Sequence, residues 1–158
     1  MKIGIPAETR SGETRVAATP ETVKKLISQK HEVFVQAGAG IASSITDQAY
    51  SDVGATIVDR AMDVISNCDM ILKVKEPLEP EFERMREKQA IFTYLHLAAN
   101  RELTEALLRR KVQAVAYETV RVLKAAGKIG LAKGLYLFHK YRLGKPEPKT
   151  NIEHLLNK

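Results

Sequence analysis

Short apolar segments alternate with helix-like segments through residues 1–120. Several of the apolar segments contain almost no polar residue, as strands buried on both faces do. Alternation of such strands with helices is typical of a parallel sheet between two helical layers. The sequence therefore predicts an α/β fold of three layers, in which a mostly parallel sheet of flavodoxin or Rossmann-like type has helices on both faces. The expected strands are 2–8, 31–40, 55–59, 70–77, 90–97 and 112–120, and the expected helices are 19–29, 46–55, 60–67, 80–89 and 100–111.

Two of the expected helices begin with recognisable capping residues. Thr19 stands where an N-cap side chain accepts a backbone N–H, and Pro20 follows at the first helical position. Glu21 lies in the first turn, where a carboxylate suits the positive end of the helix dipole. A full capping box is missing, because Thr22 stands where Glu or Gln would be needed. Asn100 is expected to cap the helix at 100–111.

Length and charge point to one domain with a basic tail. With 158 residues, 44% of them apolar, the chain is long enough for one domain, or one domain and a small appendage. The net charge of +6 is located in the tail, because residues 121–158 hold nine Lys or Arg against two Glu. Basic residues interleaved with aromatic ones leave nucleic-acid binding open there, but we favour a solvated terminal helix.

Other features narrow the class of protein. No run of about 18 apolar residues exists, so no membrane span is expected, and the first residues lack the pattern of a signal peptide. The single cysteine, Cys68, excludes an internal disulfide and suits the reducing cytoplasm, where we expect the protein. The four histidines are scattered without the spacing of metal ligands, so no metal site is expected.

Four polar side chains are expected at one edge of the sheet. Ligands of such sheets bind outside the carboxyl ends of the strands. Lys75, Tyr94 and His96 lie near such ends, and Arg15 lies in the loop after the first strand. Arg15 offers a planar fork that matches a carboxylate, Lys75 can polarise a carbonyl oxygen, and His96 can exchange a proton near neutrality. Together they suit a small 2-oxo acid, although a lone histidine is more often structural and a lysine at a strand end often reaches into water.

Six blocks of sequence strengthen this hypothesis. They are "IGIPAE", "ETRVAATPETVKKL", "EVFVQAGAGIAS", "ILKVKEPL", "FTYLHLAANRELTEALL" and "AVAYETV". In this order and at these intervals they resemble the amino-terminal domain shared by alanine dehydrogenase and the alpha subunit of nicotinamide nucleotide transhydrogenase. The resemblance covers residues 1–121. "LKVKEP" followed by "TYLHLA" looks like alanine dehydrogenase, because transhydrogenases generally lack the histidine there.

The resemblance implies a role for each candidate residue. Arg15 would bind the carboxylate of pyruvate or alanine, and Glu13 would hold the loop that carries it. Lys75 would contact the carbonyl oxygen and help to activate it. His96 would be the acid or base that exchanges a proton with the substrate, and Tyr94 would line the pocket. In the full-length family the hydride comes from NAD, held by a separate Rossmann domain with a glycine-rich turn and a catalytic aspartate.

This chain departs from the family after residue 120. The fingerprint G-x-G-x-x-G is absent, and we interpret "GAGIAS" as a turn, so no cofactor-binding residue is expected. We therefore expect the chain alone to bind no NAD and to be inactive as a dehydrogenase. Residues 122–158 are expected to form a basic, mainly helical segment. The stretch "GLAKGLYLFHKYRL" resembles the segment with which family members complete this domain, whereas an unrelated tail is the alternative.

Three hypotheses for the function remain open. We favour the substrate domain of an alanine dehydrogenase-like oxidoreductase, with pyruvate and ammonium or alanine as substrates. The second is a fragment of a transhydrogenase alpha subunit, and the third is a non-enzymatic module that binds a small acid or a partner. An apolar face that a nucleotide domain would cover should favour self-association, so a homo-oligomer is expected.

Overall fold

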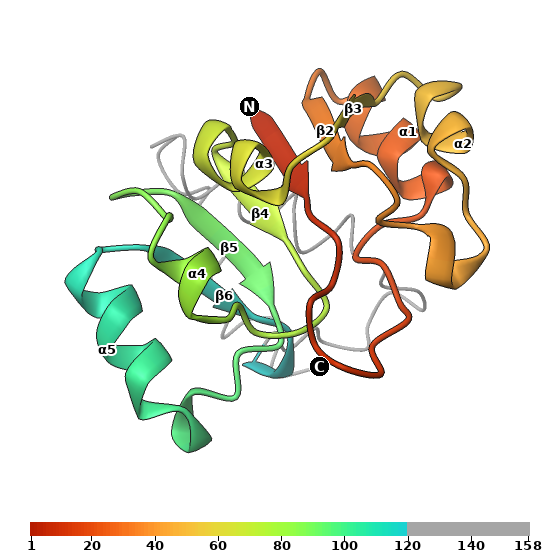
Figure 1. The fold of residues 1–158 in the computed structure, drawn as a ribbon. Helices are drawn as coiled ribbons and strands as arrows, with labels where there is room; N and C mark the ends of the chain where they lie inside the picture. Colours follow the sequence, from red (N-terminus) through yellow and green to blue (C-terminus); the bar gives the residue numbers. More distant parts are fainter. Residues whose placement is uncertain (120–158) are drawn as a thin grey trace, which may run out of the picture. The chain divides into compact units, whose positions relative to one another are not determined.

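The computed structural model describes residues 1–119, which form a six-stranded parallel sheet with helices on both faces (Figure 1). The expected α/β fold of Rossmann-like type is confirmed. In sheet order the strands are β3 (Thr56–Val58), β2 (Glu32–Gln36), β1 (Lys2–Ile5), β4 (Met70–Leu72), β5 (Ala90–Thr93) and β6 (Gln113–Ala116). The α-helices are α1 (Pro20–Ser28), α2 (Asp47–Ser51), α3 (Ala61–Asn67), α4 (Glu79–Phe82) and α5 (Arg101–Arg109). Three short 3₁₀ helices are η1 (Ile41–Ser43), η2 (Leu97–Ala99) and η3 (Tyr117–Thr119). The expected carboxyl-terminal segment at 122–158 lies outside the described residues.

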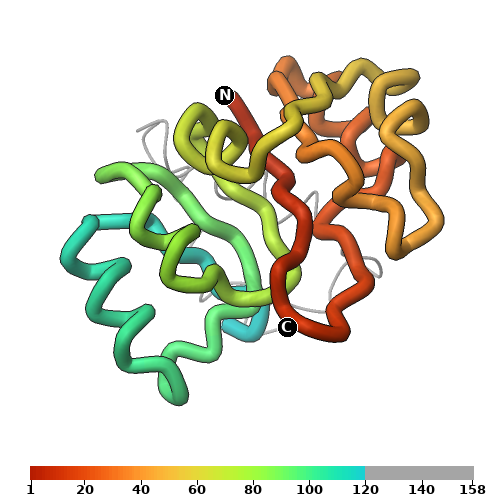
Figure 2. Tube along the Cα trace, viewed as in Figure 1, coloured from red at the N-terminus to blue at the C-terminus, as the bar shows by residue number. Residues whose placement is uncertain are grey.

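The chain reverses its direction of travel across the sheet once. It builds β1, β2 and β3 outward, returns through α3 to place β4 on the other side of β1, and continues to β5 and β6. Figure 2 shows the two halves on either side of β1. The loops that follow β1 and β4 therefore diverge at the carboxyl edge of neighbouring strands. In open α/β sheets this reversal is the usual position of a ligand site.

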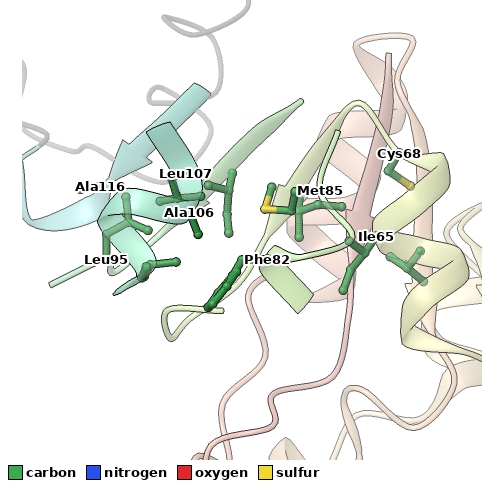
Figure 3. Packing of buried hydrophobic residues seen from close by; sticks show 12 residues of the cluster. Ile65, Cys68, Phe82, Met85, Leu95, Ala106, Leu107 and Ala116 are labelled. Atoms are coloured by element: carbon green, nitrogen blue, oxygen red, sulfur yellow. The ribbon is translucent and has the colours of Figure 1, made fainter. Parts of the chain in front are cut away.

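One face of the sheet carries a core built by α3, α4 and α5. Phe82 and Met85 lie between Ile65 and Cys68 on one side and Leu107 on the other, and all five are buried (Figure 3). The helices α1 and α2 contact β2 and β3 and supply the buried Val23, Leu26 and Tyr50.

The close approach of α3 to β1 explains the glycine in the middle of that strand. A Cβ on Gly4 would lie 2.7 Å from Val64 Cγ1 and 3.0 Å from Cys68 Sγ. Any larger residue would therefore push the helix away from the sheet.

The expected caps are confirmed. Thr19 Oγ1 accepts the N–H of Thr22 at 3.4 Å, with Pro20 as the first residue of α1. Asn100 Oδ1 accepts the N–H of Leu103 at 3.1 Å, which fixes the start of α5. Both bonds satisfy donors that the first turn of a helix leaves unpaired.

The strand expected at 70–77 is shorter than predicted. β4 ends at Leu72, so Lys75 lies in the loop that follows the strand and not on it. The reason is a competing acceptor, because the N–H groups of Val74 and Lys75 donate to the carboxylate of Glu8 at 2.7 and 3.1 Å. The carboxylate takes the place of a strand carbonyl for these two donors, although the N–H of Lys73 still donates to the carbonyl of Phe92 at 3.2 Å.

Competing hydrogen bonds also shorten two other expected elements. The strand expected at 90–97 ends at Thr93, and the N–H of His96 donates to Glu118 Oε1 at 2.8 Å instead of to a strand. The helix expected at 80–89 ends at Phe82. Further on, Gln89 Oε1 accepts the N–H of Arg86 at 2.8 Å in a local turn.

Candidate functional site

An open pocket of about 410 Å³ lies at the reversal between β1 and β4. The loop after β1 and the loop after β4 supply its walls. Three cations and two carboxylates make its lining strongly polar. The lining residues are Arg10, Ser11, Gly12, Glu13, Arg15, Lys75 and Glu76.

A tight turn presents Arg15 to this pocket. The turn is closed by the N–H of Glu13, which donates to the carbonyl of Arg10 at 3.1 Å, and Gly12 provides the positive φ of 79° that it needs. Farther along the loop, Ser43 Oγ in η1 donates to the carbonyl of Thr14 at 2.7 Å. The loop is thus fixed on both sides of Glu13.

Glu13 and Arg15 form a bidentate pair. Arg15 Nε donates to Glu13 Oε1 at 2.8 Å and Nη2 donates to Oε2 at 2.7 Å. The bonds from the Arg15 side chain and backbone, with the positive charge of Lys75 nearby, lower the pKa of Glu13 to about 2. In turn the Glu13 carboxylate raises the pKa of Arg15. Within residues 1–119 Nη1 makes no hydrogen bond, and the Arg15 side chain is 60% exposed, so the guanidinium keeps an open edge.

Lys75 enters the pocket from the other loop. Its N–H is held by Glu8, and the residue is half-buried. Within the described residues the Lys75 side chain makes no ion pair, although its charge acts on Glu13. Across the pocket Arg10 Nη2 pairs with Glu76 Oε1 at 2.5 Å and joins the two loops. The pocket thus combines an ammonium without a direct partner and a partly open guanidinium.

The lysine two residues earlier has a different environment. Lys73 is 1% exposed, and its Nζ donates to Glu81 Oε1 at 2.8 Å and lies 3.7 Å from Glu8 Oε2. The other oxygen of Glu81 accepts the N–H of Leu78 at 2.8 Å and the hydroxyl of Thr9 at 3.3 Å. Lys73 is therefore a buried structural cation beneath the loops that form the pocket.

An aromatic group follows β5 and β6. The ring of Tyr94 stacks on His96 with centroids 6.0 Å apart and an interplanar angle of 11°. Tyr94 also meets Tyr117 edge to face at 5.0 Å, and Tyr117 lies 4.3 Å from Phe92. Burial, with the charges of Glu8 and Tyr94, raises the pKa of Tyr117. Tyr117 is therefore a neutral hydroxyl in this group at neutral pH.

Glu118 fixes the backbone that carries His96. Its carboxylate accepts the N–H groups of Leu95 at 3.1 Å and His96 at 2.8 Å. Burial opposes the charged form of Glu118, but these bonds and the nearby His96 lower its pKa overall. His96 itself is exposed and has a left-handed backbone with a φ of 48°. A carboxylate thus holds an uncommon conformation at this position.

The candidate residues from the sequence fall into two groups. Arg15 and Lys75 line one pocket. Tyr94 and His96 stack on each other, and Tyr94 is not among the residues that line the pocket. His96 is not part of the pocket lining.

Sequence reasoning missed the two carboxylates that hold the loops, Glu8 and Glu118. Glu8 is the last residue of the block "IGIPAE", three residues after β1, and Glu118 lies in the block "AVAYETV", two residues after β6. An acidic residue just past a buried strand was the available signal.

The glycine turn after β2 does not fit the pyrophosphate of a dinucleotide. The glycine pair of "GAGIAS" follows β2, and a Cβ on Gly40 would lie 2.7 Å from the carbonyl of Ile45 and 2.9 Å from Tyr50 Cε2. The space at Gly40 is filled by the chain itself, so these glycines make a turn and leave no room for a pyrophosphate. Within residues 1–119 no group of His, Cys, Asp or Glu side chains is arranged to hold a metal ion. No helix in this part of the chain has the length and apolar character to cross a bilayer.

Solved structures resemble this fold. An L-alanine dehydrogenase structure matches with a TM-score of 0.75 and 45% sequence identity, over 80% of this chain and 35% of that one. A transhydrogenase structure from Sinorhizobium meliloti matches with a TM-score of 0.73 and 32% identity, over 78% of this chain and 35% of that one.

The sequence relatives of the chain are also alanine dehydrogenases. The alanine dehydrogenase of Mycolicibacterium smegmatis is 49% identical over 126 residues, which are 80% of this chain and 34% of the relative. That of Methanococcus maripaludis is 41% identical over 156 residues, or 92% of this chain and 42% of the relative. The chain thus spans between a third and about two fifths of the length of these relatives. The family model "Alanine dehydrogenase/PNT, N-terminal domain" matches residues 4–131, and the chain belongs to this family.

Proposed function

We propose that this domain binds the substrate in an alanine dehydrogenase-like oxidoreductase that converts pyruvate and ammonium to L-alanine. The observation that supports this most is the shared pocket of Arg15 and Lys75 at the reversal of the sheet. The open edge of the Arg15 guanidinium would hold the substrate carboxylate, as planar forks do. Lys75 Nζ would polarise the carbonyl oxygen and stabilise the negative charge that develops there.

His96 and Tyr94 would complete the site. His96 is exposed at the same edge of the sheet and would give a proton to the substrate oxygen, or take one from nitrogen in the reverse direction. Tyr94, which stacks on His96, would line the pocket and exclude water from one side.

The reductant has to be held elsewhere. In the full-length family NAD supplies the hydride, and the glycine turn after β2 leaves no room for its pyrophosphate. We therefore propose that the 158-residue chain does not turn over by itself and binds pyruvate weakly, because a second domain would form the other wall. Oxidation of NADH by the pure 158-residue chain with pyruvate and ammonium would contradict this.

A pyruvate titration of the ¹⁵N-labelled chain followed by NMR tests the binding site. We expect saturable shifts at the loops after β1 and β4, which Arg15→Ala and Lys75→Ala should abolish. Arg60→Ala is the matched control, because Arg60 also pairs with a carboxylate, Asp63 Oδ2 at 2.7 Å, on the surface of α3. Unchanged pyruvate binding in Arg15→Ala would overturn the proposed role of the pocket.

Three further proposals concern a transhydrogenase role, the assembly of the chain and its location. A transhydrogenase role has less support, because the identity to the transhydrogenase structure is 32% against 45% for the alanine dehydrogenase. Activity with alanine after a nucleotide-binding domain is supplied would decide between them. A homo-oligomer is proposed because an apolar face that a nucleotide-binding domain would cover should favour self-association, and size-exclusion chromatography with light scattering tests it. A cytoplasmic location is proposed from Cys68, a buried free thiol.

A further inference from the structure

Glu8 joins the two loops that form the pocket. It lies three residues beyond the end of β1, and its side chain is 3% exposed. Oε1 accepts the N–H of Val74 at 2.7 Å, and Oε2 accepts the N–H of Lys75 at 3.1 Å. Oε2 also lies 3.7 Å from Lys73 Nζ. Both oxygens of Glu8 are thus engaged by the loop that carries Lys75.

We propose that Glu8 is the positioning residue for Lys75, and that it sets the separation between Lys75 and Arg15 on which substrate binding depends. The inference rests on the proposed function for its binding part. Beyond Leu72 the N–H of Lys73 still donates to the carbonyl of Phe92 at 3.2 Å, but the N–H groups of Val74 and Lys75 donate to Glu8 and not to a strand carbonyl. A carboxylate supplies a stronger acceptor than a carbonyl oxygen, because its charge shortens and strengthens the bond.

The hydrogen bonds of Glu8 affect the site because Glu8 lies in the same loop as Arg15. Glu8 and Arg15 belong to the same loop, whereas Val74 and Lys75 belong to the other. One carboxylate therefore ties the start of the loop that carries Arg15 to the backbone that carries the ammonium of Lys75. Lys73 stabilises the charged form of Glu8, because it places a cation beside a carboxylate that is almost fully buried.

Two variants separate the reach of Glu8 from its charge. Glu8→Gln keeps the length of the side chain but removes its charge. The amide has only one oxygen, so it can accept one of the two N–H groups, and its NH₂ group would face the other. Glu8→Asp keeps the charge beside Lys73 but is one methylene shorter, so it cannot reach both N–H groups. Asp69→Asn is the control, because Asp69 Oδ2 accepts a backbone N–H, that of Lys2 at 2.8 Å, at the opposite edge of the sheet.

The measurements are made on the 158-residue chain by NMR, at a temperature at which circular dichroism shows each variant to be folded. In the unsubstituted chain we expect scalar coupling from the amides of Val74 and Lys75 to the Glu8 carboxylate, and slow hydrogen exchange of both amides. In both Glu8 variants these amides should exchange faster, and Kd for pyruvate should rise by about tenfold or more. Asp69→Asn should leave the pyruvate Kd unchanged even where it lowers the unfolding temperature.

The outcomes distinguish the two proposals. If the unsubstituted chain shows the scalar couplings to Glu8 but does not bind pyruvate, the proposed function is wrong. The hydrogen bonds by which Glu8 positions Lys75 would still be supported. Pyruvate binding that is equally tight in the Glu8 variants would overturn the positioning role alone. Absence of the couplings would overturn it as well, and this measurement needs no variant to fold.

Discussion

Replacement of Lys73 by methionine should cost far more stability than the loss of an ordinary surface ion pair. Methionine has nearly the length of lysine but no charge, so Glu81 and Glu8, with side chains 5% and 3% exposed, would lose their only ion-pair partner within the described residues. Removal of one partner from a buried ion pair typically costs about 3–5 kcal/mol. That is a large share of the roughly 5–15 kcal/mol that holds a domain folded.

Urea unfolding followed by circular dichroism measures this loss. With an m-value of about 2 kcal/mol/M, a loss of about 4 kcal/mol lowers the midpoint by about 2 M. Lys25→Met is the matched control, because Lys25 pairs with Glu21 at 2.5 Å while both side chains are largely exposed. It should change the midpoint little.

A double-mutant cycle then tests the cause. Glu81→Gln in the Lys73→Met background removes one of the two stranded charges, and its amide oxygen can still accept the N–H of Leu78. The double variant should be less destabilised than the sum of the single variants. A midpoint for Lys73→Met equal to that of Lys25→Met would refute the reasoning, since it would mean that water reaches the two carboxylates.

Three further predictions concern single groups. Gly4→Ala should destabilise the fold by about 1–3 kcal/mol, because the new Cβ would lie 2.7 Å from Val64 Cγ1, and Val64→Ala in the same chain should recover part of the loss in thermal unfolding. The Glu13 pKa is lowered from 4.5 to about 2, so the stability contributed by its pair with Arg15 is present above pH 4.5 and lost as the pH falls towards 2; an NMR titration should give that midpoint, and Arg15→Ala should move it up. Burial raises the pKa of Cys68 to about 12, so a thiol reagent at mildly alkaline pH should label it only after unfolding, and rapid labelling of the folded chain would contradict its burial.

The order and type of the elements could be predicted from the sequence because they depend on local pattern. Thr19 and Asn100 act within four residues of their partners, so the starts of α1 and α5 could be read directly. The end of β4 could not, because Glu8 competes for the N–H of Val74 from 66 positions away. Contacts between distant parts of the chain leave no periodic trace in the sequence.

The site shows the same division. Arg15 and Lys75 could be placed at one edge because the direction of parallel strands dictates it. The left-handed backbone of His96 could not be foreseen, because it depends on a carboxylate that arrives with the next strand. The sequence also could not predict that Lys73 is buried while Lys75 is only half-buried, because this difference depends on the residues that surround each side chain in the fold.

The pair between Glu13 and Arg15 has a consequence for which residue can stand at position 15. A guanidinium can serve two acids at once, an internal one along the edge of Nε and Nη2 and a visiting one through Nη1. A lysine at this position would offer Glu13 one rotatable ammonium and no second edge of fixed orientation. Because Glu13 occupies one edge of the side chain permanently, position 15 favours arginine, whose planar guanidinium keeps a second edge in a set direction.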